Sequence, residues 1–155
     1  MTRRFSSVLC GLLCALGAVA LGQKPPSDLD ALRGSWRVID ARARMSNEPG
    51  MIIDGLVDRG TVEFSGDTIT MRQLGNTDLA SYAFVLDTVA SPRRIRMVDS
   101  TTPGGVRWTG IYKVTGDTLR LSLPIEHFSD RPVPPASFNA PNTAAYIFKR
   151  DPRHP

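Results

Sequence analysis

The chain has 155 residues but only two cysteines, Cys10 and Cys14, and both lie in its first 22 residues. Beyond residue 22 there is no thiol, which excludes a disulfide or a cysteine-ligated metal in that part of the chain. Histidine is equally rare. His127 and His154 are its only representatives, whereas a zinc site needs three or four ligands. We therefore expect no metal and no cofactor, and a fold that depends on its apolar core.

Lysine is also scarce, with 3 Lys against 16 Arg. This bias is compatible with recognition of phosphate or carboxylate groups, but the arginines are scattered among acids, which favours solvated faces. Arg94 and Arg96, for example, share one face of an expected strand and are expected to face solvent. No basic stripe alternates with exposed aromatic residues, so we expect no nucleic-acid partner.

Motifs for common enzyme chemistry are missing as well. The chain has no Gly-x-Ser-x-Gly elbow and no phosphate-binding loop. Acidic residues such as Asp40, Glu63 and Glu126 could meet in space as a carboxylate pair, but nothing in their spacing predicts it. The sequence therefore predicts no catalytic residue, and an enzyme remains only an alternative.

The N-terminal residues have the pattern of a secretory signal peptide. Residues 1–4 are basic, residues 5–16 are apolar or small, and Ala18-Val19-Ala20 has the small-x-small form of a cleavage site. Cleavage is expected after Ala20 or after Gly22. We thus divide the chain into a signal peptide (1–22), a linker and helical turn (23–31), a barrel domain (32–150) and a tail (151–155).

Two alternatives to cleavage remain for this segment. An apolar run of about 18 residues is borderline for an uncleaved membrane anchor. A lipoprotein would need a cysteine after a small-residue pair, and Cys10 and Cys14 both come too early in the apolar run. With cleavage, Lys and Arg fall to 17 against 15 Asp and Glu, because Arg3 and Arg4 are removed. The expected location is the periplasm, the cell envelope or the medium, with no stable membrane span.

From Gly34 onward the apolar residues alternate with period 2, which predicts strands and not helices. Ser27 to Asp30 resembles a capping box that starts one helical turn. Residues 51–53 form either a short strand or a lid. Two Gly-Asp-Thr sequences, beginning at Gly66 and Gly116, predict tight hairpins. The expected strands are residues 35–43, 61–65, 68–73, 81–88, 94–98, 106–114, 118–123 and 144–149.

The two ends of this strand series suggest how it closes. Trp36 lies at the start and Arg150 at the end, and a cation over the Trp ring would plug one mouth of a closed up-and-down barrel. We therefore predict an all-β fold: a single antiparallel barrel of about eight strands with a short N-terminal helical turn and no C-terminal helix. The proline-rich residues 124–142, which include Phe128 and Phe138, cannot join the sheet and are expected to form a long loop.

Several motifs in this order resemble an uncharacterised family of small, usually exported lipocalin-like domains, found mainly in planctomycete bacteria. The similarity covers residues 32–150 and implies a lipocalin-like fold and export, but no activity. The chain departs from the family pattern around residues 131–138, where Pro-Val-Pro-Pro lengthens the loop. The motifs are Gly34-Ser35-Trp36-Arg37-Val38, Phe64-Ser65-Gly66-Asp67, the Gly-Ile-Tyr…Gly-Asp-Thr-Leu block from Gly110 to Leu119, Arg131-Pro132 with Phe138, and Phe148-Lys149-Arg150.

Aromatic residues fall mainly on the inward positions of the expected strands. They either line a cavity for a small apolar molecule, capped by the proline-rich loop, or simply fill the barrel. In the second case the protein is a structural or protein-interaction domain without a ligand. Gly110 leaves room for a ligand or allows the strand to curve. The candidate cavity residues are Trp36, Phe64, Tyr82, Phe84, Trp108, Tyr112 and Tyr146, with Trp36 and Arg150 packing at the barrel end. The sequence names neither a ligand nor an oligomeric state.

Overall fold

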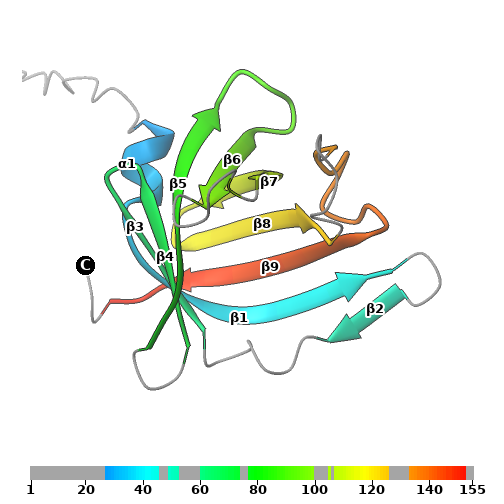
Figure 1. The fold of residues 1–155 in the computed structure, drawn as a ribbon, viewed down its shortest axis with the longest axis horizontal. Helices are drawn as coiled ribbons and strands as arrows, with labels where there is room; N and C mark the ends of the chain where they lie inside the picture. The colour runs from blue at the N-terminus through cyan, green and yellow to red at the C-terminus, as the bar shows by residue number, and fades with distance from the viewer. Residues whose placement is uncertain are drawn as a thin grey trace, which may run out of the picture.

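A computed structural model describes residues 27–45, 49–52, 60–73, 77–99, 105, 107–125 and 133–152. Within these ranges the chain forms one short helix and nine strands (Figure 1). No helix of the described part is both long and apolar enough to cross a lipid bilayer. The elements are α1 (Asp28–Leu32), β1 (Gly34–Arg44), β2 (Pro49–Ile52), β3 (Thr61–Ser65), β4 (Thr68–Gln73), β5 (Thr77–Asp87), β6 (Arg94–Asp99), β7 (Arg107–Thr115), β8 (Thr118–Pro124) and β9 (Thr143–Arg150).

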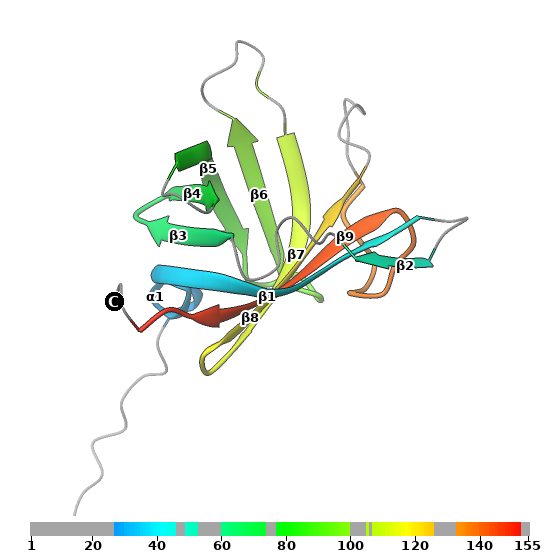
Figure 2. The same cartoon turned by 90° about the horizontal axis from the view of Figure 1, so that it is seen from below.

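Eight of the strands form a closed antiparallel barrel. Each strand from β3 to β9 pairs with the next, and β1 closes the ring by pairing with both β3 and β9. The second view, turned by 90°, shows the same ring, with α1 beside one end of it (Figure 2). The predicted all-β single barrel with a short N-terminal helix is therefore confirmed, and the described residues after Arg150 add no helix.

β1 has different neighbours at its two ends. Its first residues, Gly34 to Arg37, pair with β3, whereas Arg42 to Arg44 pair with β2. β9 pairs with β1 along nearly its whole length, interrupted by a bulge between Val38 and Asp40. β2 is thus an addition outside the ring, and the bulge lies where β1 exchanges β3 for β2. Such bulges bend a strand and increase its twist.

Most strand limits agree with the sequence pattern. β3 and β4 have the expected bounds, and the segment left open as strand or lid is β2. The largest difference is β5, which begins at Thr77 and not at residue 81. Asp78 and its polar neighbours look like a turn in the sequence, but Thr77 and Asp78 pair with Gln73 and Arg72 of β4.

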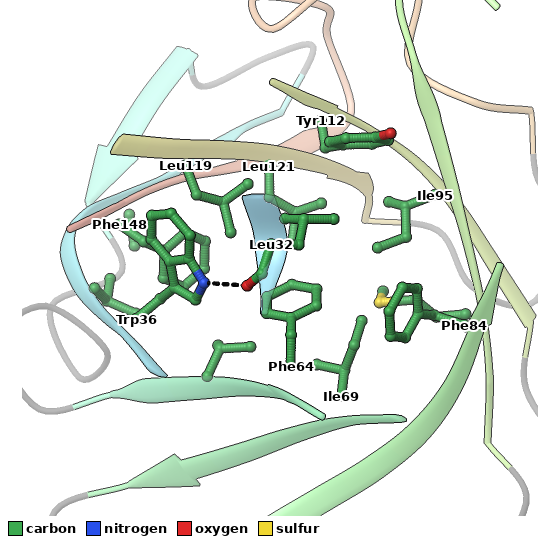
Figure 3. Close-up of a cluster of buried hydrophobic side chains, with 14 residues drawn as sticks. Leu32, Trp36, Phe64, Ile69, Phe84, Ile95, Tyr112, Leu119, Leu121 and Phe148 are labelled. Carbon is green, nitrogen blue, oxygen red and sulfur yellow. Dashed lines mark hydrogen bonds between the residues drawn. The ribbon is translucent and has the colours of Figure 1, made fainter. Parts of the chain in front are cut away.

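The core fills the half of the barrel next to α1 (Figure 3). Trp36, Phe64, Phe84 and Phe148 all point into it from different strands and are nearly or fully buried. On β6, Ile95 and Met97 are buried while Arg94 and Arg96 are exposed. On β6 the period-2 pattern therefore identified the inward and outward faces correctly.

Phe138, in the proline-rich connection, lies on the outside of the barrel, whereas Pro124 and Ile125 at the start of that connection line a cavity inside it. Pro124 is the last residue of β8 and pairs with Thr143, so the expectation that residues 124–142 stay out of the sheet is wrong for this residue.

The guanidinium of Arg120 is 4.7 Å from the centre of the Phe138 ring. Arg120 points outward, because its neighbours Leu119 and Leu121 are buried in the core. The Phe138 ring therefore contacts an outward-facing arginine and not the pocket. Phe128 and His127 lie outside the described residues.

Candidate ligand cavity

The end of the barrel away from α1 contains a cavity of about 610 Å³. We call this the cavity end, and we call the end at α1, Trp36 and Arg150 the plugged end. Most of the side chains around the cavity are apolar. The described residues that line it are Val38, Ala43, Met45, Gly60, Thr61, Val62, Met71, Arg72, Ala80, Tyr82, Met97, Trp108, Leu121, Leu123, Pro124, Ile125, Ala144, Tyr146 and Phe148.

The size of the inward residues explains why one half is filled and the other is hollow. β5 presents Phe84 to the core but Ala80 to the cavity, and β9 presents Phe148 and then Ala144. On β1 the bulky Trp36 is at the plugged end, and a third alanine, Ala43, lines the cavity. An eight-stranded barrel is just wide enough to be filled by large side chains, so alanines at one end leave a void.

The seven predicted cavity residues divide between the two halves. Tyr82, Trp108 and Tyr146 line the cavity. The other four, Trp36, Phe64, Phe84 and Tyr112, belong to the filled core and do not line it. Alternation along a strand predicts which side chains point inward, but it does not say how far along the barrel axis each one lies. Aliphatic lining residues such as Met71, Leu121 and Leu123 have the same inward pattern, but a prediction based on aromatic residues misses them.

Two aromatic pairs stiffen the walls. The rings of Tyr82 and Trp108 meet edge to face, with centroids 4.9 Å apart and an interplanar angle of 86°. The rings of Tyr146 and Phe148 stack at 6.0 Å. Such ring pairs contribute to stability beyond the burial of apolar area alone, and they limit the conformational freedom of the large side chains. The ring contacts therefore hold the aromatic side chains of the cavity wall in place.

The plugged end is closed by a network of contacts around α1. The guanidinium carbon of Arg150 lies 4.2 Å from the centre of the Trp36 ring, the contact expected from the sequence. Arg150 also donates hydrogen bonds to the carbonyl oxygens of Ala31 and Arg33, at 2.7 and 2.8 Å. The indole N–H of Trp36 donates to Leu32 O at 2.7 Å (Figure 3). These contacts satisfy carbonyl groups at the C-terminal end of the helix.

A second network holds the start of α1. The hydroxyl of Tyr112 donates to Asp28 Oδ2 at 2.5 Å, and Arg93 Nη1 lies 2.5 Å from Asp28 Oδ1. Burial, and then the hydrogen bond to Asp28, raise the pKa of the Tyr112 hydroxyl well above its ordinary value. Tyr112 therefore remains a hydrogen-bond donor at any physiological pH and helps to hold the helix that covers the barrel end.

Charge at the cavity is sparse and balanced. Arg72 is the one charged residue among the described lining residues, and it forms an ion pair with Glu63 on the neighbouring strand β3. Asp40, another of the acids considered from the sequence, pairs with Arg42 at 3.1 Å. Glu126 lies outside the described residues. Glu63 and Asp40 are thus each engaged by an arginine.

Gly110 lies where two strands approach each other closely. A Cβ atom at this position would lie 2.5 Å from Leu123 Cδ2 and 2.6 Å from Ser122 O. The glycine is therefore required by the close approach of β7 to β8, and not by space for a ligand. Because Leu123 lines the cavity, this contact also fixes part of the cavity wall.

No three His, Cys, Asp or Glu side chains in the described ranges come together as a metal site. His127 and His154 lie outside those ranges. Neither a family model, nor a curated protein, nor a solved structure matches the chain. The description that the geometry supports is a small antiparallel β-barrel that is plugged at one end and has an apolar cavity at the other.

Proposed function

We propose that this protein is an exported lipocalin-like binding protein that holds one small, mostly apolar molecule inside its barrel. The observation that carries the proposal is the apolar cavity of about 610 Å³. This volume falls within the range of about 300 to 1,000 Å³ typical of small-molecule sites. The basic and apolar N-terminal pattern supports export, and the motif resemblance supports the lipocalin-like assignment.

The cavity end is well suited to such a ligand on physical grounds. Apolar atoms that face a void lose the dispersion contacts that a packed neighbour would give them. An apolar ligand would restore these contacts, and it would leave water at a gain of about 0.8 kcal/mol per buried CH₂ group. The plugged end, in contrast, already has its side chains in contact, so we place the ligand at the cavity end alone.

A pair of variants on β5 tests the proposal. Ala80 lines the cavity, whereas Ala83 is exposed on the same strand, so Ala80→Phe and Ala83→Phe add the same ring inside and outside. Binding is measured by the fluorescence of N-phenyl-1-naphthylamine, an apolar dye that brightens in dry sites. We expect the wild type and Ala83→Phe to bind the dye, and Ala80→Phe to bind it at least about tenfold more weakly.

Thermal unfolding serves as the control for folding. Filling a cavity generally leaves stability unchanged or raises it, so Ala80→Phe should melt no earlier than the wild type. If the dye binds neither the wild type nor Ala83→Phe, or if all three proteins bind it equally, the ligand-binding proposal is wrong. A domain that acts through its outer surface would then be the better description.

A further inference from the structure

The three tyrosines of the chain differ in what their hydroxyl groups contact. The Tyr112 hydroxyl donates to Asp28 at the plugged end. Tyr82 and Tyr146 line the cavity, and neither hydroxyl has a hydrogen-bond partner among the described residues. Neither hydroxyl oxygen is among the fully buried polar atoms without a partner, so each is accessible from the cavity. A ligand that excludes water from such a hydroxyl must supply an acceptor in its place. The cavity therefore contains polar groups that the described part of the barrel does not satisfy.

Tyr146 is the more isolated of the two. It lies on β9 opposite Leu121 of β8 and Ala41 of β1, and its ring stacks on Phe148. Burial is the one cause that raises the pKa of its hydroxyl, with no contribution from a charge or a hydrogen bond. The hydroxyl is therefore protonated, is a hydrogen-bond donor, and is surrounded by apolar side chains.

Tyr82 has an acidic neighbour instead. It pairs in register with Asp99 of β6, and burial and then the charge of Asp99 raise the pKa of its hydroxyl. A carboxylate nearby offers this hydroxyl an acceptor from the protein itself. Tyr146 has no such neighbour, so of the two cavity tyrosines it is the one that needs an acceptor from a ligand.

The charges around the cavity limit what that ligand can be. Arg72 is already paired with Glu63, so an anionic group that approached Arg72 would also meet a carboxylate. No other described lining residue is charged. A charged ligand group would thus lose its hydration without a dedicated counter-ion, which is strongly unfavourable in apolar surroundings.

On these observations, and given the proposed function, we propose that the cavity selects an uncharged, mostly apolar molecule that carries a carbonyl or ether oxygen, and that the Tyr146 hydroxyl donates a hydrogen bond to this oxygen. The room available, about 610 Å³, equals the volume of about 20 water molecules in the liquid, so a compact molecule with one or two rings fits. Its apolar part would lie against the Tyr82 and Trp108 rings.

Three probes of similar shape test this selection. 2-Acetylnaphthalene carries a carbonyl, 2-ethylnaphthalene replaces it with a hydrocarbon, and 2-naphthoate carries a full negative charge. Each probe is titrated into the protein without its expected signal peptide, after the protein has been loaded with N-phenyl-1-naphthylamine. Displacement of the dye is measured as a fall in its fluorescence. We expect the ketone to bind more tightly than the naphthoate.

The Tyr146→Phe variant assigns the hydrogen bond. Removing this hydroxyl should weaken ketone binding between about two- and tenfold, the range that one net hydrogen bond gives, and leave the hydrocarbon unchanged. Tyr112→Phe is the matched control, since it removes a tyrosine hydroxyl at the plugged end, outside the cavity, and it should leave the affinity for both probes unchanged. Because the Tyr146 hydroxyl has no partner in the described residues, its removal should not lower the melting temperature.

The results separate this inference from the proposed function. If the ketone and the hydrocarbon lose affinity equally in Tyr146→Phe, if Tyr112→Phe weakens ketone binding as much as Tyr146→Phe does, or if the naphthoate binds most tightly, the selection by Tyr146 is wrong while ligand binding stands. If no probe displaces the dye and the dye itself does not bind, both proposals fail together.

Discussion

The guanidinium carbon of Arg150, in the last strand, lies 4.2 Å from the centre of the Trp36 ring in the first. The same guanidinium donates to two carbonyl groups at the end of α1. One side chain therefore joins the closing pair of strands to the helix that covers them. This contact depends on residues 114 positions apart in the sequence, and it forms only when the barrel closes.

Replacing Arg150 tests how much this contact stabilises the fold. Arg150→Ala should lower the free energy of unfolding by about 2 to 4 kcal/mol, because it removes a cation–π contact and leaves two carbonyl groups without their donor. Lys149→Ala, next to it on the exposed face, should change stability by less than about 0.5 kcal/mol. Urea unfolding followed by fluorescence measures both. Equal effects of the two variants would contradict the role given to Arg150.

The sequence was sufficient for the barrel but not for the cavity. Gly66 and Gly116 mark hairpins, and both adopt the positive φ that such turns need, at 59° and 54°. Ile95 and Met97 alternate with Arg94 and Arg96, which is the pattern of an antiparallel strand with one face in the core and the other exposed to solvent. These signals are local, so a single sequence carries them.

The position of the void is a different kind of property. It depends on how the inward residues of all eight strands stack along the barrel axis, which is set by the register of each pair. Phe84 and Tyr82 are both inward aromatics on β5, yet only Tyr82 lines the cavity. The bulge between Val38 and Asp40 shifts this register in β1 and left no clear mark in the sequence. The alanines Ala43, Ala80 and Ala144 were the available signal for a hollow end.

The two tryptophans should report on ligand binding differently. Trp108 lines the cavity, whereas Trp36 is fully buried at the plugged end. Addition of 2-acetylnaphthalene should therefore quench the intrinsic fluorescence of Trp36→Phe, in which Trp108 remains, and have little effect on Trp108→Phe. Quenching that persists in Trp108→Phe would place the ligand elsewhere. A control without a ketone, such as 2-ethylnaphthalene, separates binding from quenching by the carbonyl.

Alkaline pH should weaken the hydrogen bond by which Tyr112 stabilises α1. Its hydroxyl has a pKa raised from the ordinary value of 10.0, so the unfolded chain loses this proton first as the pH rises. The stability that Tyr112 provides is thus fully present below pH 10 and falls as the pH rises toward its folded-state pKa. The advantage of the wild type over Tyr112→Phe, about 1 kcal/mol at pH 8, should shrink between pH 10 and 11. Urea midpoints at several pH values measure it, and parallel curves for the two proteins would contradict it.

Export makes a prediction for the N-terminus of the mature protein. If the signal peptide is cleaved after Ala20 or after Gly22, N-terminal sequencing of the secreted or periplasmic fraction should give Leu21 or Gln23 as the first residue. Replacing Ala18 and Ala20 with bulky residues should block cleavage, because the peptidase accepts small side chains there. Recovery of the intact chain from the membrane fraction would support the anchor instead.

Gly110 and Gly116 allow a final comparison, because both are glycines for different reasons. At Gly110 a methyl group would meet Leu123 and the Ser122 carbonyl at 2.5 and 2.6 Å, so Gly110→Ala should lower the free energy of unfolding by about 1 to 3 kcal/mol or more through overpacking.

At Gly116 a methyl group meets nothing within 4 Å, and the loss of stability on substitution comes from the φ of 54°. Gly116→Asn should therefore be milder than Gly116→Ala, since Asn tolerates this conformation. At Gly110 the loss of stability comes from the lack of space and not from φ, so Gly110→Asn should be more destabilising than Gly110→Ala. Thermal unfolding of the four variants gives the order directly, and Asn rescue at Gly110 would show that its backbone, and not the approach of β8, requires glycine.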